Sequence, residues 1–301
     1  MLAKTLALTF CLGAVGGAAL ADPKFEYGKA AEVEKVKGTE YNASAEAGIV
    51  FTTGNSETIT ATAGIKAARK TGLNKIAFDG TLTYAKSAVR VLEDNNGNGL
   101  VDNDSEITSV ETTTANTLAA KLRYDRFLTK YNSLFIAALA ARDVPAGKDL
   151  VLGAQAGYSR QLFKSKTAEA VAELGYDYSH EDLVTGPSNS IHSLRAFLGY
   201  KAEMTEGTTF ETSLEGLTNL NEEEHATRMG EPATIGEDTR LNFKASVSSK
   251  IGKNLSFQTS LEVKYDQRPG PLGIKNLAPG FVPEASKMDT IMKASLIYTI
   301  F

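Results

Sequence analysis

Apolar and polar residues alternate with a period of two from Asn42 to the end of the chain. Ile76, Phe78, Leu82 and Tyr84, for example, alternate with polar or small residues along one such stretch. A helix would repeat its apolar residues about every 3.6 positions, so this pattern predicts β-strands. The predicted strands cover about 42–54, 56–68, 74–88, 107–125, 131–143, 149–163, 168–181, 190–204, 208–220, 239–251, 254–267 and 287–301.

The connections between these strands differ in length according to their parity. If the first strand runs outward from the periplasm, the even-numbered connections, such as 71–74 and 205–207, are all short. The longer connections fall on the opposite side, at 89–106, 182–189, 221–238 and 268–286. Outer-membrane barrels have an even number of strands, short periplasmic turns and longer external loops. The sequence therefore predicts an all-β fold, a twelve-stranded antiparallel transmembrane β-barrel of the bacterial outer membrane.

The first residues have the pattern of a removable export signal. Met1 and Lys4 precede an apolar stretch at 6–20, and Ala19-Leu20-Ala21 is a small-x-small cleavage site. We therefore expect three parts: a signal peptide at 1–21, a charged periplasmic N-terminal arm at 22–41, and the barrel at 42–301.

Charge and cysteine content limit the partners and cross-links that are expected for the exported chain. Without the signal the chain has 31 Lys+Arg against 36 Asp+Glu, a net charge of −5, and this acidic balance argues against nucleic acid as a partner. Cys11, the one cysteine, lies within the signal, so we expect neither disulfides nor thiolate metal sites in the exported chain.

The polar side of the alternation carries charges of both signs, which a closed barrel would place inside. The predicted lumen-lining residues are Glu46, Lys66, Asp79, Lys121, Arg123, Asp125, Glu173, Asp177, Arg195, Lys201, Glu211, Glu215, Lys244, Glu262, Lys264 and Asp266. About eight strands make a filled barrel and about sixteen leave a channel, so twelve lie between the two cases. The lumen is either a narrow path for small polar solutes or a plug of salt bridges.

One loop has the donor spacing of a calcium site. Asp94, Asn96, Asn98 and Asp102 place side-chain oxygens at the alternating positions that a calcium loop uses. The pattern departs from an EF-hand because Ser105 stands where a bidentate glutamate is needed. Either the loop binds Ca²⁺, the one cofactor that the sequence suggests, or it is a solvated external loop.

Two of the three histidines, His180 and His192, flank the predicted external loop 182–189, close to Ser190. By parity both could point outward, where a barrel hydrolase of lipids would place a Ser–His pair. No flanking motif supports this reading, and polar residues at a barrel rim are the simpler interpretation. We therefore expect no enzymatic activity.

The first hairpin resembles that of a known family. Its parts are the strand from Gly48, the turn Thr53-Gly-Asn-Ser56 and a second strand ending in basic residues at Lys70, and strand pieces such as Leu122-Arg-Tyr124 recur later. This resembles the salt-induced outer-membrane protein family, a bacterial group of unknown function. The resemblance covers about 42–301 and implies an outer-membrane location and a link to osmotic or salt stress. It implies no reaction and no catalytic residues.

From these patterns we expect a monomeric, non-enzymatic barrel that supports envelope integrity or the passive passage of small polar solutes. Its expected partners are outer-membrane lipid, lipopolysaccharide and, during insertion, the barrel assembly machinery. Two alternatives stay open: an outer-membrane lipid hydrolase, and an adhesion or interaction barrel with a calcium-stabilised external loop.

Overall fold

The computed structural model describes residues 38–52, 57–92, 107–144, 147–184, 187–223, 233–269 and 286–300. Residues 1–37, with the predicted signal peptide and most of the arm, and the predicted calcium loop at 94–106 lie outside these ranges. In the described part of the chain, no helix is long and apolar enough to cross a membrane.

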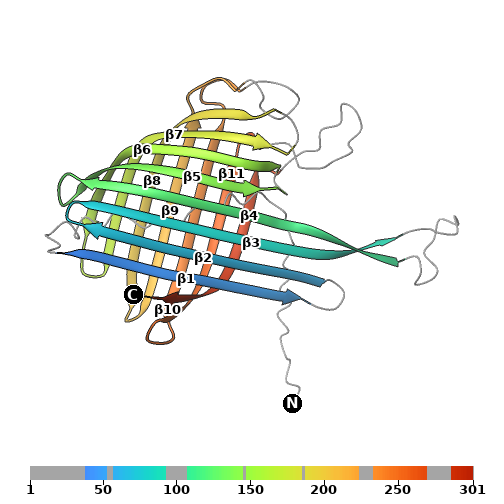
Figure 1. Ribbon diagram of the computed structural model, residues 1–301, viewed down its shortest axis with the longest axis horizontal. Coiled ribbons are helices and arrows are strands. Elements are labelled where there is room, and N and C mark those ends of the chain that lie inside the picture. The colour runs from blue at the N-terminus through green and yellow to red at the C-terminus, as the bar shows by residue number, and fades with distance from the viewer. Residues whose placement is uncertain are drawn as a thin grey trace, which may run out of the picture.

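Twelve antiparallel strands close into one barrel (Figure 1). Each strand pairs with its neighbour in sequence, and β1 closes the ring by pairing with β12. The strands are β1 Thr39–Thr52, β2 Glu57–Thr71, β3 Asn74–Leu92, β4 Ile107–Phe127, β5 Asn132–Asp143, β6 Lys148–Lys164, β7 Ala168–Leu183, β8 Asn189–Thr205, β9 Thr208–Asn219, β10 Thr239–Lys250, β11 Leu255–Asp266 and β12 Met288–Thr299. The predicted closed, twelve-stranded antiparallel barrel is confirmed.

Along each strand, apolar and polar side chains point to opposite faces of the sheet. Ile76 and Leu122 point outward and are 45% and 52% exposed, whereas Asp79 and Lys121 point inward and are 8% and 5% exposed. A closed sheet has an inner and an outer face. Because the polar side chains point to the inner face, the ring encloses them together in the lumen. The interior of this protein is therefore a mainly polar lumen with a few buried apolar residues, and most of its large apolar residues form the outer surface.

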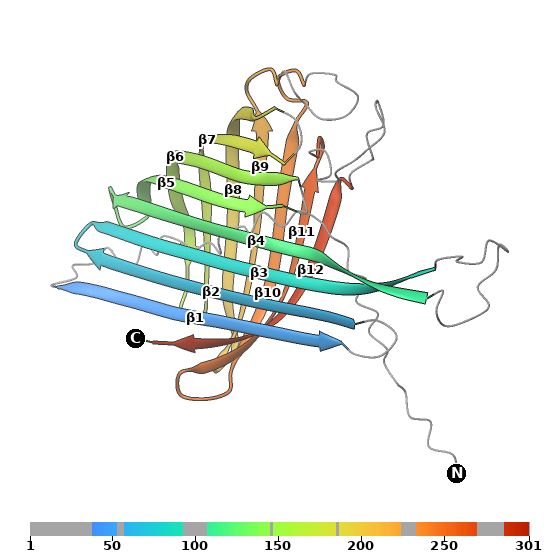
Figure 2. The ribbon, with the colours of Figure 1, turned by 45° about the vertical axis from the view of Figure 1, so that its right-hand side comes forward.

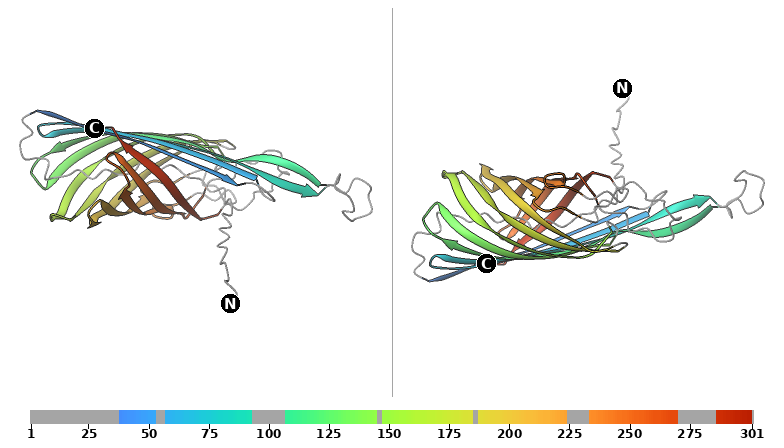
Figure 3. Two further views of the ribbon diagram at one scale, coloured as in Figure 1. Left: turned by 90° about the horizontal axis from the view of Figure 1, so that it is seen from below. Right: turned by 90° about the horizontal axis from the view of Figure 1, so that it is seen from above.

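Tight turns close one end of the barrel. Gly72, between β2 and β3, and Gly207, between β8 and β9, have φ angles of 55° and 80°. Glycine adopts this left-handed conformation without the steric cost that a Cβ would impose. At the other end the β3–β4 hairpin projects well beyond the remaining strands (Figures 1 and 3). It is longer than the pattern predicted, because β3 runs beyond 88 to Leu92, which pairs with Ile107 at the start of β4.

The closing seam between β1 and β12 is short. Among the described residues, four pairs join these strands, from Ser44↔Thr299 to Ala47↔Leu296, and the backbone N–H of Ile300 also donates to the Ala43 carbonyl oxygen. Every other strand pair has at least eleven residue pairs. Beyond them β12 runs away from β1 (Figure 2). Inside the seam, Lys293 Nζ lies 2.6 Å from Glu46 Oε1, so an ion pair supplements the few backbone bonds.

Candidate functional site

A chain of ion pairs fills the lumen beside β4, β7, β8 and β9. Arg123 Nη2 lies 2.7 Å from Asp125 Oδ1 and 2.9 Å from Glu173 Oε1. Arg195 Nη1 lies 2.9 Å from Glu173 Oε2, and Arg195 Nε donates to Glu215. The side chains of Glu173 and Arg195 are 0% exposed, so water does not reach them. This part of the lumen is a packed salt-bridge cluster.

Aromatic rings and glycines shape the space around this cluster. The guanidinium carbon of Arg123 lies 4.1 Å from the centre of the Phe135 ring, and that of Arg195 lies 5.7 Å from the same ring. A Cβ at Gly157 would lie 2.8 Å from Phe135 Cζ, and one at Gly175 would lie 2.5 Å from the carbonyl oxygen of Ala156. Gly157 therefore makes room for the ring on which the arginines rest, and Gly175 lets the backbones of β6 and β7 approach closely.

Neutral polar side chains extend the cluster sideways. Gln155 accepts a hydrogen bond from Lys121 Nζ at 2.8 Å and donates one to Asp177 Oδ1 at 2.7 Å. Asn242 donates to Glu215 Oε2 at 3.2 Å. The sequence prediction omitted both amides because it counted only charged residues, although their parity places them on the lumen face.

The β10–β12 side of the lumen is less tightly packed. Glu262 lies 3.2 Å from Lys264 and 3.6 Å from Lys244. The side chains of Lys244 and Lys293 keep 18% and 21% of their surface exposed inside the closed ring. Water therefore reaches Lys244 and Lys293, whereas Lys264 is buried. We call this group of paired charges the wet strip: Lys244, Glu262, Lys264 and Lys293.

All sixteen predicted lumen residues lie in described strands, on the inward side of the alternation. Ten are buried: Glu46, Asp79, Lys121, Arg123, Asp125, Glu173, Asp177, Arg195, Glu215 and Lys264. The other six are half-buried: Lys66, Lys201, Glu211, Lys244, Glu262 and Asp266. The structure thus brings the charges together in two groups, one dry and one wet.

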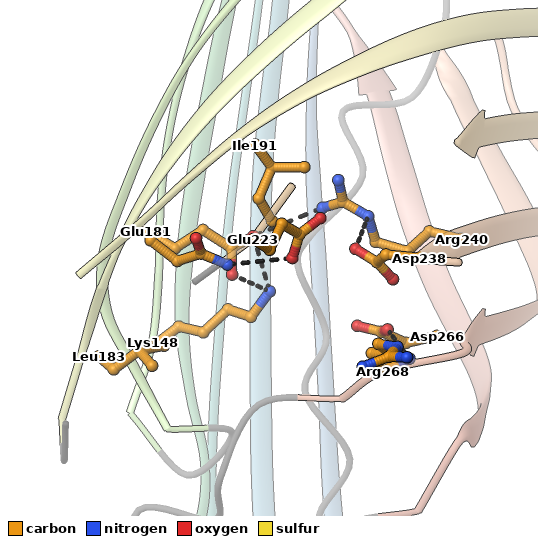
Figure 4. A pocket seen from close by; sticks show the side chains of 10 residues that line it. Lys148, Glu181, Leu183, Ile191, Glu223, Asp238, Arg240, Asp266 and Arg268 are labelled. Atoms are coloured by element: carbon orange, nitrogen blue, oxygen red, sulfur yellow. Dashed lines mark hydrogen bonds and ion pairs between the residues drawn. The ribbon is translucent and has the colours of Figure 1, made fainter. Parts of the chain in front are cut away.

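The mouth at the loop end holds a third charged group (Figure 4). Lys148 Nζ lies 2.9 Å from Glu181, whose carboxylate lies 3.5 Å from Arg240 Nη1. Arg240 Nε is 3.6 Å from Asp238 Oδ2, and Glu223 also lines this hollow of about 350 Å³, solvent included. The sequence prediction missed these residues. Lys148 precedes a register shift in the β6–β7 pair that breaks the simple alternation.

Asn219 anchors the segment that carries Asp238 across the mouth. Its amide donates to the carbonyl oxygens of Asn221 and Thr234, both at 2.9 Å. Its side-chain oxygen accepts from the backbone N–H groups of Gly236 and Asp238, at 2.8 and 3.0 Å. All the hydrogen-bonding capacity of this buried amide is used. It therefore holds both ends of the loop between β9 and β10 in place.

Burial raises the pKa of Asp238 to about 7, and the opposing effect of Arg240 is too small to restore the usual value. The neighbouring acids Asp266, Glu223 and Glu181 raise the pKa further. Burial also raises the pKa of Glu223. Besides Arg240, the other basic groups facing this hollow are Lys148 and Arg268.

The folded state is therefore expected to lose stability as the pH rises. Asp238 binds its proton more tightly folded than unfolded, where its pKa is near 3.8. The free energy of unfolding should thus fall between about pH 4 and pH 7. The Asp238→Asn variant should lose much of this slope, which urea titrations at several pH values in detergent would measure. The exposed Asp149→Asn serves as control, and an unchanged slope in Asp238→Asn would contradict the assignment.

The remaining predicted sites have different outcomes. Asp94, Asn96, Asn98 and Asp102 lie outside the described residues, so calcium binding stays a prediction. Within the ranges that are described, no three His, Cys, Asp or Glu side chains are grouped to hold a metal ion. The predicted histidines lie on the outer side of β7 and β8, away from the lumen.

Comparison with known proteins gives one family and several distant structures. No curated protein matches the chain. Solved structures with similarity include the NanC porin, with 9% identity, a TM-score of 0.40, and coverage of 86% of this chain and 97% of that one. The translocator domain of the autotransporter NalP from Neisseria meningitidis has 13% identity, a TM-score of 0.40, and coverage of 88% and 89%. An anion-selective porin from Comamonas acidovorans has 9% identity, a TM-score of 0.36, and coverage of 87% and 97%.

The family model described as "Protein of unknown function, DUF481" matches residues 45–300. This range includes nearly the whole barrel, from the first strand to the last. The chain therefore belongs to the DUF481 family.

Proposed function

We propose that this protein is a barrel of the bacterial outer membrane that lets small polar solutes pass along the wet strip of its lumen. The observation that carries the proposal is the unequal packing of the lumen. Arg195 and Glu173 are closed off from water on one side, while Lys244 and Lys293 keep exposed surface on the other.

The outer surface supports the membrane location. Leu118, Ile136 and Leu174 are each more than half exposed on the outside of the ring. They belong to a belt of exposed aliphatic side chains that continues around the strands. Soluble proteins rarely expose so continuous an apolar surface, whereas a bilayer solvates it favourably. With the lumen enclosing the charges, hydrocarbon is the solvent that suits this exterior.

The salt-bridge cluster sets the expected size and selectivity of the path. Because it occupies one side of the lumen, we expect solutes to pass mainly along the strip beside β10–β12. That strip sets Lys244, Lys264 and Lys293 against Glu262 and Glu46, so positive charge is only slightly in excess. We therefore expect a small conductance and weak ion selectivity.

Planar bilayers provide the test. The folded protein should produce small, discrete current steps. Lys244→Gln, which removes one water-accessible positive charge, should shift the reversal potential in a KCl gradient toward cations. Arg142→Gln is the matched control, because Arg142 pairs with Asp149 on the outside of the ring. Selectivity that does not change in Lys244→Gln would refute passage along the strip. A silent bilayer with folded protein would favour a sealed barrel that supports envelope integrity.

Other aspects of the role follow from the resemblance and from this location. We expect a monomer that is inserted by the barrel assembly machinery and surrounded by outer-membrane lipid and lipopolysaccharide. A link to salt or osmotic stress is also proposed, and growth of a deletion strain at high salt would test it.

A further inference from the structure

Three polar side chains meet on the outer side of the β7–β8 hairpin, at its loop end. Ser190 Oγ lies 2.8 Å from His180 Nδ1, and these residues are register partners across the two strands. His180 Nε2 lies 3.4 Å from Asp182 Oδ1. Serine, imidazole and carboxylate thus stand in line, in the order that activates a nucleophile.

This group lies at the edge of the outer apolar belt that is nearest the loop end of the barrel. On the same outward side of β7 and β8, Leu174 and Leu194 are about half exposed. The side chains of His180 and Asp182 are 36% and 48% exposed, so a molecule approaching from outside can reach them. If the barrel lies in a membrane as proposed above, this is the boundary between outer-leaflet lipid and water.

Aromatic residues hold the surroundings in place. The rings of Tyr178 and His192 lie 5.1 Å apart, and Tyr176 Oη is hydrogen-bonded to His192 Nδ1. The backbone N–H of His192 donates to Asn221 Oδ1 at 2.8 Å, which ties this strand end to the buried segment at the mouth. The Tyr178 hydroxyl is 3.5 Å from Ser190 Oγ, close enough to donate to an oxyanion formed beside it.

We propose that Ser190, His180 and Asp182 form a hydrolytic site for fatty-acyl esters of outer-leaflet lipids. Asp182 Oδ1, 3.4 Å from Nε2, favours the tautomer of His180 that carries its proton on Nε2, which leaves Nδ1 free to accept a proton. His180 takes the proton of the Ser190 hydroxyl as Oγ bonds to the ester carbonyl carbon. The bond from that carbon to the alcohol oxygen then breaks, and the alcohol leaves with the proton.

Water completes the reaction at the same group. His180 accepts a proton from a water molecule, whose oxygen bonds to the carbonyl carbon of the acyl-serine. The bond to Ser190 Oγ breaks, and the proton returns to this oxygen. One ester and one water yield one fatty acid and one alcohol, without a metal or a redox partner.

The sequence pattern indicated a possible Ser–His pair here, but it could not predict how the side chains are arranged. It placed His180 and Ser190 near one loop, and it singled out no carboxylate. Asp182 lies two residues after His180 on the same strand, so the period of two places both on one face. The strand register then brings Ser190 opposite His180.

A fluorophosphonate probe tests the nucleophile directly. Folded protein in detergent should form an adduct at Ser190, identified by mass spectrometry of the peptide. The adduct should be absent in Ser190→Ala and form about 100-fold more slowly in His180→Gln, the usual size of a general-base contribution. Ser188→Ala is the matched control, because Ser188 is exposed two residues away and should not affect labelling.

Fatty-acid release identifies the source of the ester. Mixed micelles of phospholipid and of lipopolysaccharide are assayed separately with parent and Ser190→Ala protein, after heat-modifiable gel mobility confirms folding. Release from either lipid that depends on Ser190 supports the proposal and names its source. The proposal is overturned if folded parent protein forms no Ser190 adduct, or if it releases fatty acid from neither lipid. Bilayer conductance of Ser190→Ala should equal that of the parent, so this test is separate from that of solute passage.

Discussion

Replacing Glu173 with alanine is expected to lower the free energy of unfolding by about 3–5 kcal/mol, the range found when one partner of a buried ion pair is removed. Glu173 bridges Arg123 and Arg195, at 2.9 Å from each. Without it, both guanidinium groups lose a partner in a part of the lumen that water does not reach. Arg123 then keeps Asp125 as a charged partner and Arg195 keeps Glu215, but the donors that faced Glu173 are left buried without that acceptor.

Urea unfolding in detergent, followed by the loss of heat-modifiable gel mobility, measures this effect. Glu211→Ala is the control, since Glu211 pairs with Lys201 at 2.6 Å while both side chains are about one third exposed. A pair that is open to water contributes only about 0–1 kcal/mol. If Glu173→Ala fails to fold, Glu173→Gln retains an acceptor and allows the measurement. A loss below about 1 kcal/mol in Glu173→Ala would contradict the buried cluster.

The Gly175→Ala variant is expected to be destabilised by about 1–3 kcal/mol, the usual cost of overpacking. Its new Cβ would lie 2.5 Å from the carbonyl oxygen of Ala156 and 3.0 Å from the Cα of Gly157. Both neighbours are backbone atoms, so the strands themselves must separate to accept the methyl group. That movement would also disturb Phe135, which a Cβ at the facing Gly157 would approach to 2.8 Å.

The same urea titration, with Gly64→Ala as control, checks this prediction. A Cβ at Gly64 would meet nothing nearer than Glu46 Cβ at 3.5 Å, which is ordinary contact. This second variant should be neutral or slightly stabilised, because alanine loses less backbone entropy than glycine on folding. Equal stability of the two variants would show that strands β6 and β7 do not approach as closely as described.

The alternation of residue types was enough to predict the ring of strands and the face of each side chain. Parity placed Asp79 and Lys121 inside and Ile76 outside, because a strand offers only two sides. It could not predict which charges would meet. Arg123 and Glu173 are fifty residues apart, and their contact depends on strand tilt and stagger, which the alternation does not encode.

The mouth was harder to predict from the sequence. Asp238 lies outside the strands, and its burial depends on the hydrogen bonds that Asn219 makes to the backbone. Lys148 lies next to an irregularity in register, where counting by twos fails. The alternation of residues could place His180 and Asp182 on one face of β7, but it could not predict that Ser190 lies opposite His180. That contact depends on the register between β7 and β8.

The four-pair junction of the first and last strands should be the weakest point of the ring under mechanical load. In a ring of hydrogen-bonded neighbours, rupture begins where the fewest bonds must break together, and every other junction has at least eleven. A force applied to the protein should therefore unzip β12 from β1 first and leave a curved sheet of hairpins. During assembly we expect the reverse order: the sheet forms hairpin by hairpin, and the joining of Ser44–Ala47 to Leu296–Thr299 comes last and is the most easily reversed step.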